Sequence, residues 1–129
     1  MREFTLTFFI ILMFSRNALS EDWLNVGPAA TGDAYFVMDM DSIKEDEDNV
    51  VSFITRTFPN SSKQYLYGTT KFTEEERAIN CLNITSKTIT IRNYGENGNL
   101  LGTSTYKQKP FEPIKAGSII EKMYNVVCY

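Results

Sequence analysis

The sequence predicts an α+β fold: an antiparallel sheet of about six strands with one C-terminal helix packed on it and one disulfide. Three observations lead to this expectation. Short runs rich in β-branched and aromatic residues alternate with turn residues between positions 23 and 106. The last segment changes to a helical period. The chain has only two cysteines, Cys81 and Cys128.

Three candidate strands occupy the first half of the chain. Residues 23–26 end at a Gly-Pro pair, residues 34–40 follow a Thr-Gly-Asp turn, and residues 50–58 stop before a Pro-Asn pair. These runs favour strands, whereas glycine, proline and asparagine favour turns. The stretch between the second and third runs is acidic, and we expect it to form a solvated loop that contacts a partner. The charged end of this loop consists of Glu45, Asp46, Glu47 and Asp48.

Four further candidate strands lie at residues 65–72, 78–85, 87–94 and 99–106. Because an Asn-Gly turn separates the last two, they are expected to form a hairpin. The charged run at residues 73–77 predicts a solvated turn or a single helical turn. Two prolines beyond residue 106 then end strand pairing, since proline has no amide hydrogen to donate to a ladder.

The last segment predicts a helix of about ten residues that begins after Ser118. Ser118 and Glu121 form a capping box, in which the serine hydroxyl accepts from the Glu121 amide while the Glu121 side chain reaches back to the cap. The apolar side of the helix consists of Ile119, Ile120, Met123 and Val127. A helix this short is marginal alone in water, so this side is expected to dock on the sheet.

The two cysteines most simply form one disulfide in an oxidising compartment. The rival interpretation is a pair of free or catalytic thiols. That alternative is disfavoured because the spacing is not Cys-x-x-Cys and no histidine is present to lower a thiol pKa. With Cys81 in a strand and Cys128 at the end of the helix, a bridge would pin the helix to the sheet.

The amino terminus reads as a secretory signal. Residues 1–20 contain a charged start at Arg2, an apolar run at 4–14 and a small-residue cleavage site, so cleavage is expected before Glu21. The apolar run is about half as long as a membrane-spanning helix. The exported part, residues 21–129, is therefore expected to be one domain with no membrane span.

The charge balance of the exported part excludes several classes of function. Removing the signal leaves 11 basic and 15 acidic residues, and the basic ones form no patch in sequence, which disfavours nucleic acid as a partner. The absence of histidine excludes a Ser-His-Asp triad and histidine-metal sites. The acidic stretch lacks the glycine and ligand spacing of a calcium loop, and nothing around it builds a carboxylate pair for glycoside hydrolysis. We therefore expect no enzyme, metal or cofactor.

Several segments together resemble the bacterial surface-adhesin protein E family. These are the tryptophan that opens the exported domain, AYFVMDMDSI, NCLNIT, YGENGNLL and the ending FEPIKAGSIIEKMYNVVC, which span residues 23–128. The resemblance implies an antiparallel sheet with the terminal helix packed across it, a bridge between Cys81 and Cys128, and an adhesive role. Members that act as adhesins are held at the cell surface, whereas no lipid-acceptor cysteine follows the expected cleavage site here.

Two functional hypotheses follow. The first is an exported, non-enzymatic binding protein of the bacterial envelope that resembles a surface adhesin and contacts a host matrix protein. The alternative is a periplasmic accessory factor, such as an inhibitor of a lysozyme-type hydrolase. The expected location is secreted or periplasmic, with surface association under the first hypothesis. Strand edges within residues 78–106 would also allow a homodimer.

Overall fold

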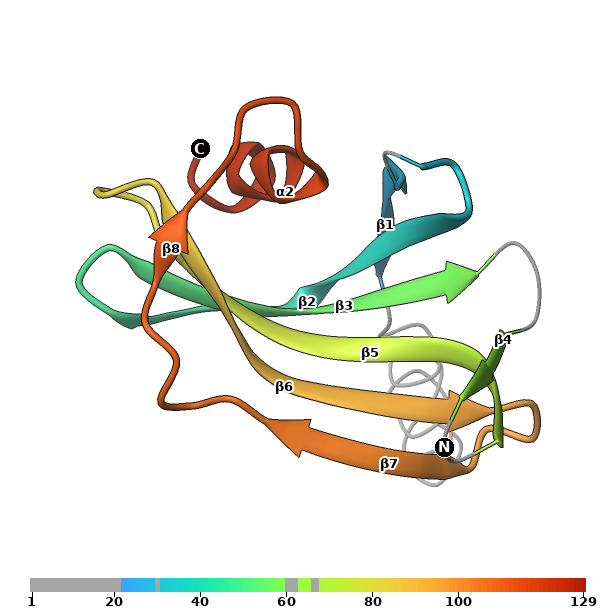
Figure 1. The fold of residues 1–129 in the computed structure, drawn as a ribbon. Helices are drawn as coiled ribbons and strands as arrows, with labels where there is room; N and C mark the ends of the chain where they lie inside the picture. Colours follow the sequence, from blue (N-terminus) through green and yellow to red (C-terminus); the bar gives the residue numbers. More distant parts are fainter. Residues whose placement is uncertain (1–21, 30, 60–62, 66–67) are drawn as a thin grey trace, which may run out of the picture.

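The computed structural model describes residues 22–29, 31–59, 63–65 and 68–129, which form one antiparallel sheet with a helix packed on it (Figure 1). The predicted fold class is confirmed. The strands are β1 (Trp23–Pro28), β2 (Ala34–Glu47), β3 (Val50–Pro59), β4 (Lys63–Tyr65), β5 (Gly68–Asn80), β6 (Thr85–Gly95), β7 (Leu100–Thr105) and β8 (Glu112–Pro113), and helix α2 spans Ile119–Val127. The predicted signal, residues 1–20, lies outside the described residues.

The sheet follows the strand order β1-β2-β3-β5-β6-β7, with β4 paired to β5 and β8 paired to β6. All of these pairings are antiparallel. Strands β5 and β6 are paired on both sides, so β7 is the edge strand of the region at residues 78–106. A homodimer through strand edges stays a prediction, and it now concerns β7. No helix in the described parts of the chain is long and apolar enough to cross a membrane.

Strand β5 runs without interruption through residues 73–77, so the turn predicted there is wrong. Every residue of this run pairs with β3 on one side, and on the other side β6 pairs with the same run. The prediction of one strand over residues 65–72 is also wrong, because residues 63–65 form β4, which pairs antiparallel with residues 68–70 of β5. Strand pairing also resumes after Pro110 and includes the second proline, since Pro113 in β8 pairs with Thr85 of β6, so the prediction that the prolines end strand pairing is wrong.

The hydrophobic core lies between the helix and one face of the sheet. Its centre consists of Met38 in β2, Phe53 in β3, Ile79 in β5 and Met123 in α2. All four side chains are at most 1% exposed. The predicted apolar side of the helix is confirmed, since its isoleucines and valines pack against this cluster while Lys122 and Asn125 are exposed.

Strand β1 lies close to the helix at Gly27. This residue has φ +138°, a conformation that side-chain-bearing residues rarely adopt, and a Cβ there would lie 3.2 Å from Lys122 Nζ and 3.9 Å from Ile119 Cδ1. The register of β1 against β2 shifts at the same point. Glycine therefore serves both the backbone geometry and the approach of the helix to the first strand.

Candidate functional site

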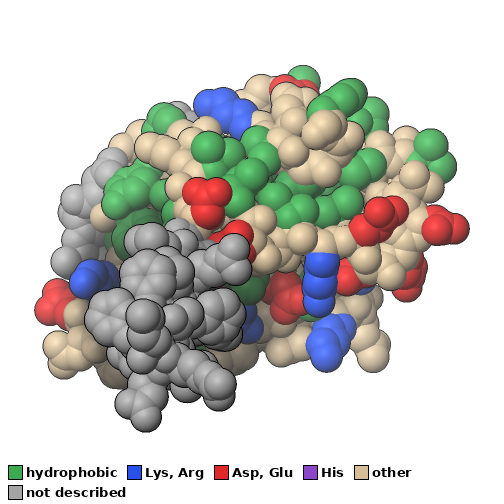
Figure 2. Space-filling model, turned by 180° about the vertical axis from the view of Figure 1, so that it is seen from behind, with side chains coloured by type: hydrophobic (Ala, Val, Ile, Leu, Met, Phe, Trp, Pro, Cys, Tyr) green, Lys and Arg blue, Asp and Glu red, His purple; other side chains and the backbone are tan. Residues whose placement is uncertain are grey.

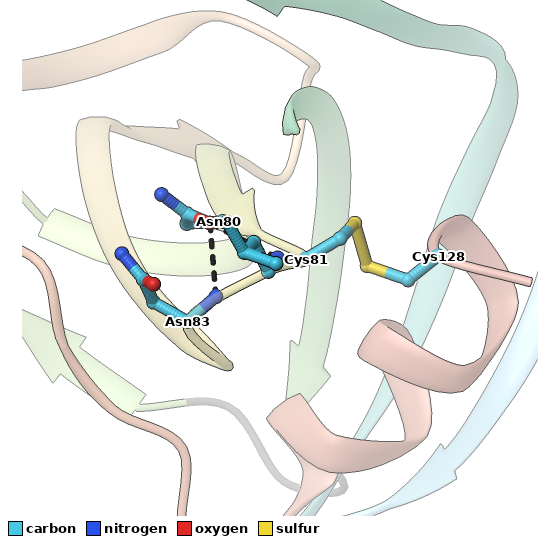
Figure 3. Close-up of a disulfide and its surroundings, with 5 residues drawn as sticks. Asn80, Cys81, Asn83 and Cys128 are labelled. Carbon is cyan, nitrogen blue, oxygen red and sulfur yellow. Dashed lines mark hydrogen bonds between the residues drawn. A yellow bond between two sulfur atoms is a disulfide. The ribbon is translucent and has the colours of Figure 1, made fainter. Parts of the chain in front are cut away.

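The disulfide joins Cys81 to Cys128, as predicted, with the two Cα atoms 5.6 Å apart (Figure 3). The expected placement of Cys81 inside a strand is wrong, because it opens the turn between β5 and β6. Asn80 holds that turn: its Oδ1 accepts from the amides of Leu82 at 3.0 Å and Asn83 at 3.1 Å. Side-chain acceptors of this kind stabilise turns at the expense of continued strand pairing. The bridge therefore connects a tight turn to the end of α2.

Ser118 lies at the N-cap of α2, where its Oγ accepts from the Glu121 amide at 3.2 Å. The Glu121 side chain reaches back one residue further than the motif predicts and accepts from the Gly117 amide at 3.1 Å. The Ser118 hydroxyl also donates to the Lys115 carbonyl at 2.6 Å. These contacts satisfy amides at the start of the helix and fix the entry of the chain into it.

The acidic stretch forms the end of a hairpin, so the predicted loop is wrong. Residues 45–47 belong to β2, and Asp48 with Asn49 makes the two-residue turn into β3. Asn49 has φ 67°, which asparagine tolerates in tight hairpin turns. The charged side chains are all exposed, so the backbone ladder continues with little desolvation of carboxylates. In Figure 2, acidic side chains gather at the end of the molecule that carries this turn in Figure 1.

No group of three or more acidic, cysteine or histidine side chains in the described part of the chain is placed to hold a metal ion. Within β2, one oxygen of Asp39 already accepts from the Asp41 amide at 3.0 Å. At the hairpin end, Asp46 lies 3.8 Å from the ammonium of Lys44, and both side chains are well exposed. Such an exposed pair contributes little to stability.

Sequence reasoning missed a charged network centred on Glu74 of β5. Glu74 Oε1 accepts from Arg56 Nε of β3 at 3.3 Å. Its other oxygen accepts from Arg92 Nε of β6 at 3.1 Å and from the Tyr94 hydroxyl at 3.4 Å. The Glu74 side chain is 12% exposed, so two cations from the neighbouring strands balance a largely buried charge.

A row of aromatic rings crosses four strands next to this network. The rings belong to Tyr35, Phe58, Phe72 and Tyr94, with successive centroids 5.2, 5.4 and 4.9 Å apart. Arg56 lies over the rings of Trp23, at 4.5 Å, and Phe72, at 4.7 Å. Contacts of this type each contribute about 0.5–1 kcal/mol or more. The row lies at the opposite end of the β2–β3 hairpin from the acidic turn, so the structure does not bring the two together.

The opposite face of β5 carries a second ion pair, between Arg77 and Glu75. Arg77 Nε also donates to Thr55 Oγ1 of β3 at 3.4 Å. Burial lowers the pKa of the Arg77 guanidinium, and the charge and hydrogen bond of Glu75 oppose that shift. Consecutive charged residues of β5 thus find partners on both faces of the sheet.

A local signal for the network exists in the sequence. Arg56 and Arg92 each lie two residues before an aromatic residue in a predicted strand, which indicates that each pair shares one face. Which strands are neighbours, and in which register, is absent from that signal. The convergence of both arginines on Glu74 therefore required the tertiary structure.

Comparison with known proteins identifies a family and several similar solved structures. The model of a family described as surface-adhesin protein E matches residues 23–129. A structure of Haemophilus influenzae protein E covers 85% of this chain and 84% of its own, with 13% identity and a TM-score of 0.57. A second crystal form of that protein aligns with 13% identity, 85% and 87% coverage and a TM-score of 0.56. Protein E from non-typeable Haemophilus influenzae aligns with 12% identity, 83% and 84% coverage and a TM-score of 0.52. A search of curated proteins found no significant match.

Proposed function

Because this chain belongs to the surface-adhesin protein E family, we propose that it is an exported binding protein of the bacterial envelope that adheres to a host matrix protein. The family match over residues 23–129 supports the adhesive role. The likeness to protein E structures extends to the fold of the sheet and helix. We propose that it acts by binding, without a cofactor and without turnover.

The observation on which this proposal rests is an exposed corner that combines charge with apolar surface. The Cys81 amide donates to the Asn49 carbonyl at 2.7 Å, which joins the turn of the β2–β3 hairpin to the turn between β5 and β6. The second turn exposes Leu82 (72% exposed) and Ile84 (48% exposed). We call the carboxylates of residues 45–48 together with these two side chains the acidic corner.

The acidic corner has the properties of a protein-contact surface. Its carboxylates would steer a basic partner and raise the rate of association. Its exposed leucine and isoleucine offer apolar area to bury on contact. The disulfide braces the turn that supports it, so little conformational entropy would be lost when a partner binds.

Neutralising the four carboxylates is expected to weaken binding to an immobilised basic matrix protein by about tenfold, mainly through a slower association rate. The variant is Glu45→Gln, Asp46→Asn, Glu47→Gln and Asp48→Asn. Since all four side chains are exposed, the melting temperature should stay within a few degrees of the wild type. Surface plasmon resonance at several salt concentrations measures the effect, and the salt dependence should become weaker in the variant.

A control places the same kinds of substitution at two positions elsewhere: Asp22→Asn with Glu96→Gln, both exposed and outside the acidic corner. This control should bind like the wild type. Leu82→Asn should increase the dissociation rate without changing the salt dependence. Binding that is unaffected by salt and by the four substitutions would remove the acidic corner from the mechanism. Inhibition of a lysozyme-type hydrolase, with no matrix binding, would favour the periplasmic accessory factor.

We also propose that the protein is secreted through cleavage before Glu21. The charged start, the short apolar run and the small-residue site support this step. Intact mass and N-terminal sequencing of the exported protein are expected to show Glu21 as the first residue. Retention of residues 1–20 would contradict cleavage and indicate an anchored form.

A further inference from the structure

Two surface depressions adjoin the connection between β7 and β8. The first, of about 320 Å³, lies between this connection and β6, and Ser86, Lys87, Thr88, Tyr106, Lys109 and Glu112 contribute to its lining. The second, of about 600 Å³, is formed by residues 105–110 and shares Tyr106 and Lys109 with the first. Their volumes fall within the range of about 300–1,000 Å³ typical of small-molecule sites.

The lysines around these depressions are held in place by other groups. Lys87 Nζ donates to the Lys107 carbonyl at 3.4 Å and lies 5.0 Å from the centre of the Phe111 ring. Lys109 Nζ lies 5.1 Å from the centre of the Tyr106 ring. An ammonium group has three donors, and the Lys107 carbonyl accepts from only one of those of Lys87. Positioned lysines lose less entropy when a ligand binds.

The charge of this region is opposite in sign to that of the whole chain. Three lysines and one carboxylate, Glu112, line the two depressions, whereas the exported part carries 11 basic and 15 acidic residues. A local positive potential in an acidic protein favours an anionic ligand and would raise its rate of association. An excess of three lysines over one carboxylate is therefore the main feature of the region.

We propose that the two depressions bind a saccharide that carries carboxylate or sulfate groups. The lysines supply charge-assisted hydrogen bonds to the anionic groups. The hydroxyls of Ser86 and Thr88 and the carboxylate of Glu112 can bond to sugar hydroxyls. The Tyr106 ring, which Lys109 Nζ contacts, contributes apolar surface to the same lining. Glu112 also disfavours ligands of very high charge density, because it would repel them. An acidic peptide is the competing ligand, since it offers carboxylates without the sugar ring and its hydroxyls.

Calorimetric titration of the exported protein tests this inference with four hexamers. Hyaluronan hexasaccharide supplies carboxylates and heparin hexasaccharide supplies sulfates as well, whereas chitohexaose is uncharged and hexaglutamate is the acidic peptide. At least one anionic saccharide should bind about tenfold more tightly than both chitohexaose and hexaglutamate. Free glucuronic acid distinguishes recognition of a single sugar from recognition of the polymer.

A double variant and a control variant with a single substitution test the location. Lys87→Gln with Lys109→Gln should lower the affinity for the anionic saccharide by about tenfold or more, since each lysine would lose a charge-assisted hydrogen bond. Lys71→Gln, an exposed lysine of β5 outside the depressions, should change the affinity by less than about twofold. In wild-type NMR spectra, shift changes should centre on residues 86–91 and 105–113.

Three results would overturn the inference. The first is that neither anionic saccharide binds. The second is that hexaglutamate binds more tightly than both anionic saccharides. The third is that Lys71→Gln and the double variant lose the same affinity for the anionic saccharide. The inference goes beyond the proposed adhesion to a protein and can fail separately. The variant with four neutralised carboxylates in the acidic corner should lose matrix-protein binding and keep saccharide binding, whereas the double lysine variant should behave in the opposite way.

Discussion

Replacing Cys128 by serine is expected to lower the free energy of unfolding by up to about 4 kcal/mol, because the bridge closes a long loop in the unfolded chain. The two cysteines are 47 positions apart. A loss of that size is a large share of the stability of a domain of about 100 residues. Denaturant unfolding under oxidising conditions, followed by circular dichroism, measures the difference.

Two controls separate the bridge from the side chain that is replaced. The wild type in excess reductant and the double variant Cys81→Ser with Cys128→Ser should both match the single variant. Hydrogen exchange should also be faster at the Cys81 amide, which donates to Asn49 at the acidic corner. Two titratable thiols in the native oxidised protein would contradict the bridge.

Replacing Arg77 by methionine is expected to cost roughly 2–3 kcal/mol of stability, because it leaves the Glu75 carboxylate without its cation. Removing one partner of a buried ion pair usually costs about 3–5 kcal/mol. We expect less here, since 14% of the Arg77 side chain and 16% of the Glu75 side chain are exposed to solvent. Thermal and denaturant unfolding of the variant measure the loss.

A double variant distinguishes the loss of stability caused by the unpaired Glu75 carboxylate from the loss caused by changed packing. Arg77→Met combined with Glu75→Leu should recover most of the stability, because no unpaired charge remains on that face of β5. Lys71→Met, an exposed position in the same strand, should stay within about 0.5 kcal/mol of the wild type. A double variant as unstable as the sum of its two single variants would show that the pair does not act as a unit.

The acidic corner shows which structural features a local sequence pattern predicts and which it does not. Residues 45–48 are correctly identified by their charge as an exposed segment, but residues 45–47 extend a strand and Asp48 begins a tight turn where a loop is expected. Backbone pairing with β3 does not require apolar side chains as long as the side chains remain in water. The sequence also contains no sign that this hairpin end lies beside the turn that begins at Cys81, because that contact joins segments about 30 positions apart.

By itself, the sequence determined the features that depend on local order or on counting. The capped helix follows from a serine, a glutamate and a 3.6-residue period, and the bridge follows from the presence of only two cysteines. The alternation of strand and turn residues likewise predicted the class of sheet.

Only the tertiary structure decided how the charges of β5 are accommodated. Taken alone, residues 73–77 resemble a solvated turn, yet they form the middle of the sheet. On one face of β5, Arg56 and Arg92 approach Glu74 from the strands on either side. On the other face, Arg77 pairs with Glu75. Strand neighbours and register are set by packing across the whole sheet, and a shift of one residue would send every side chain to the opposite face. The local pattern therefore indicates which side chains share a face of one strand, but not which residues of distant segments become their partners.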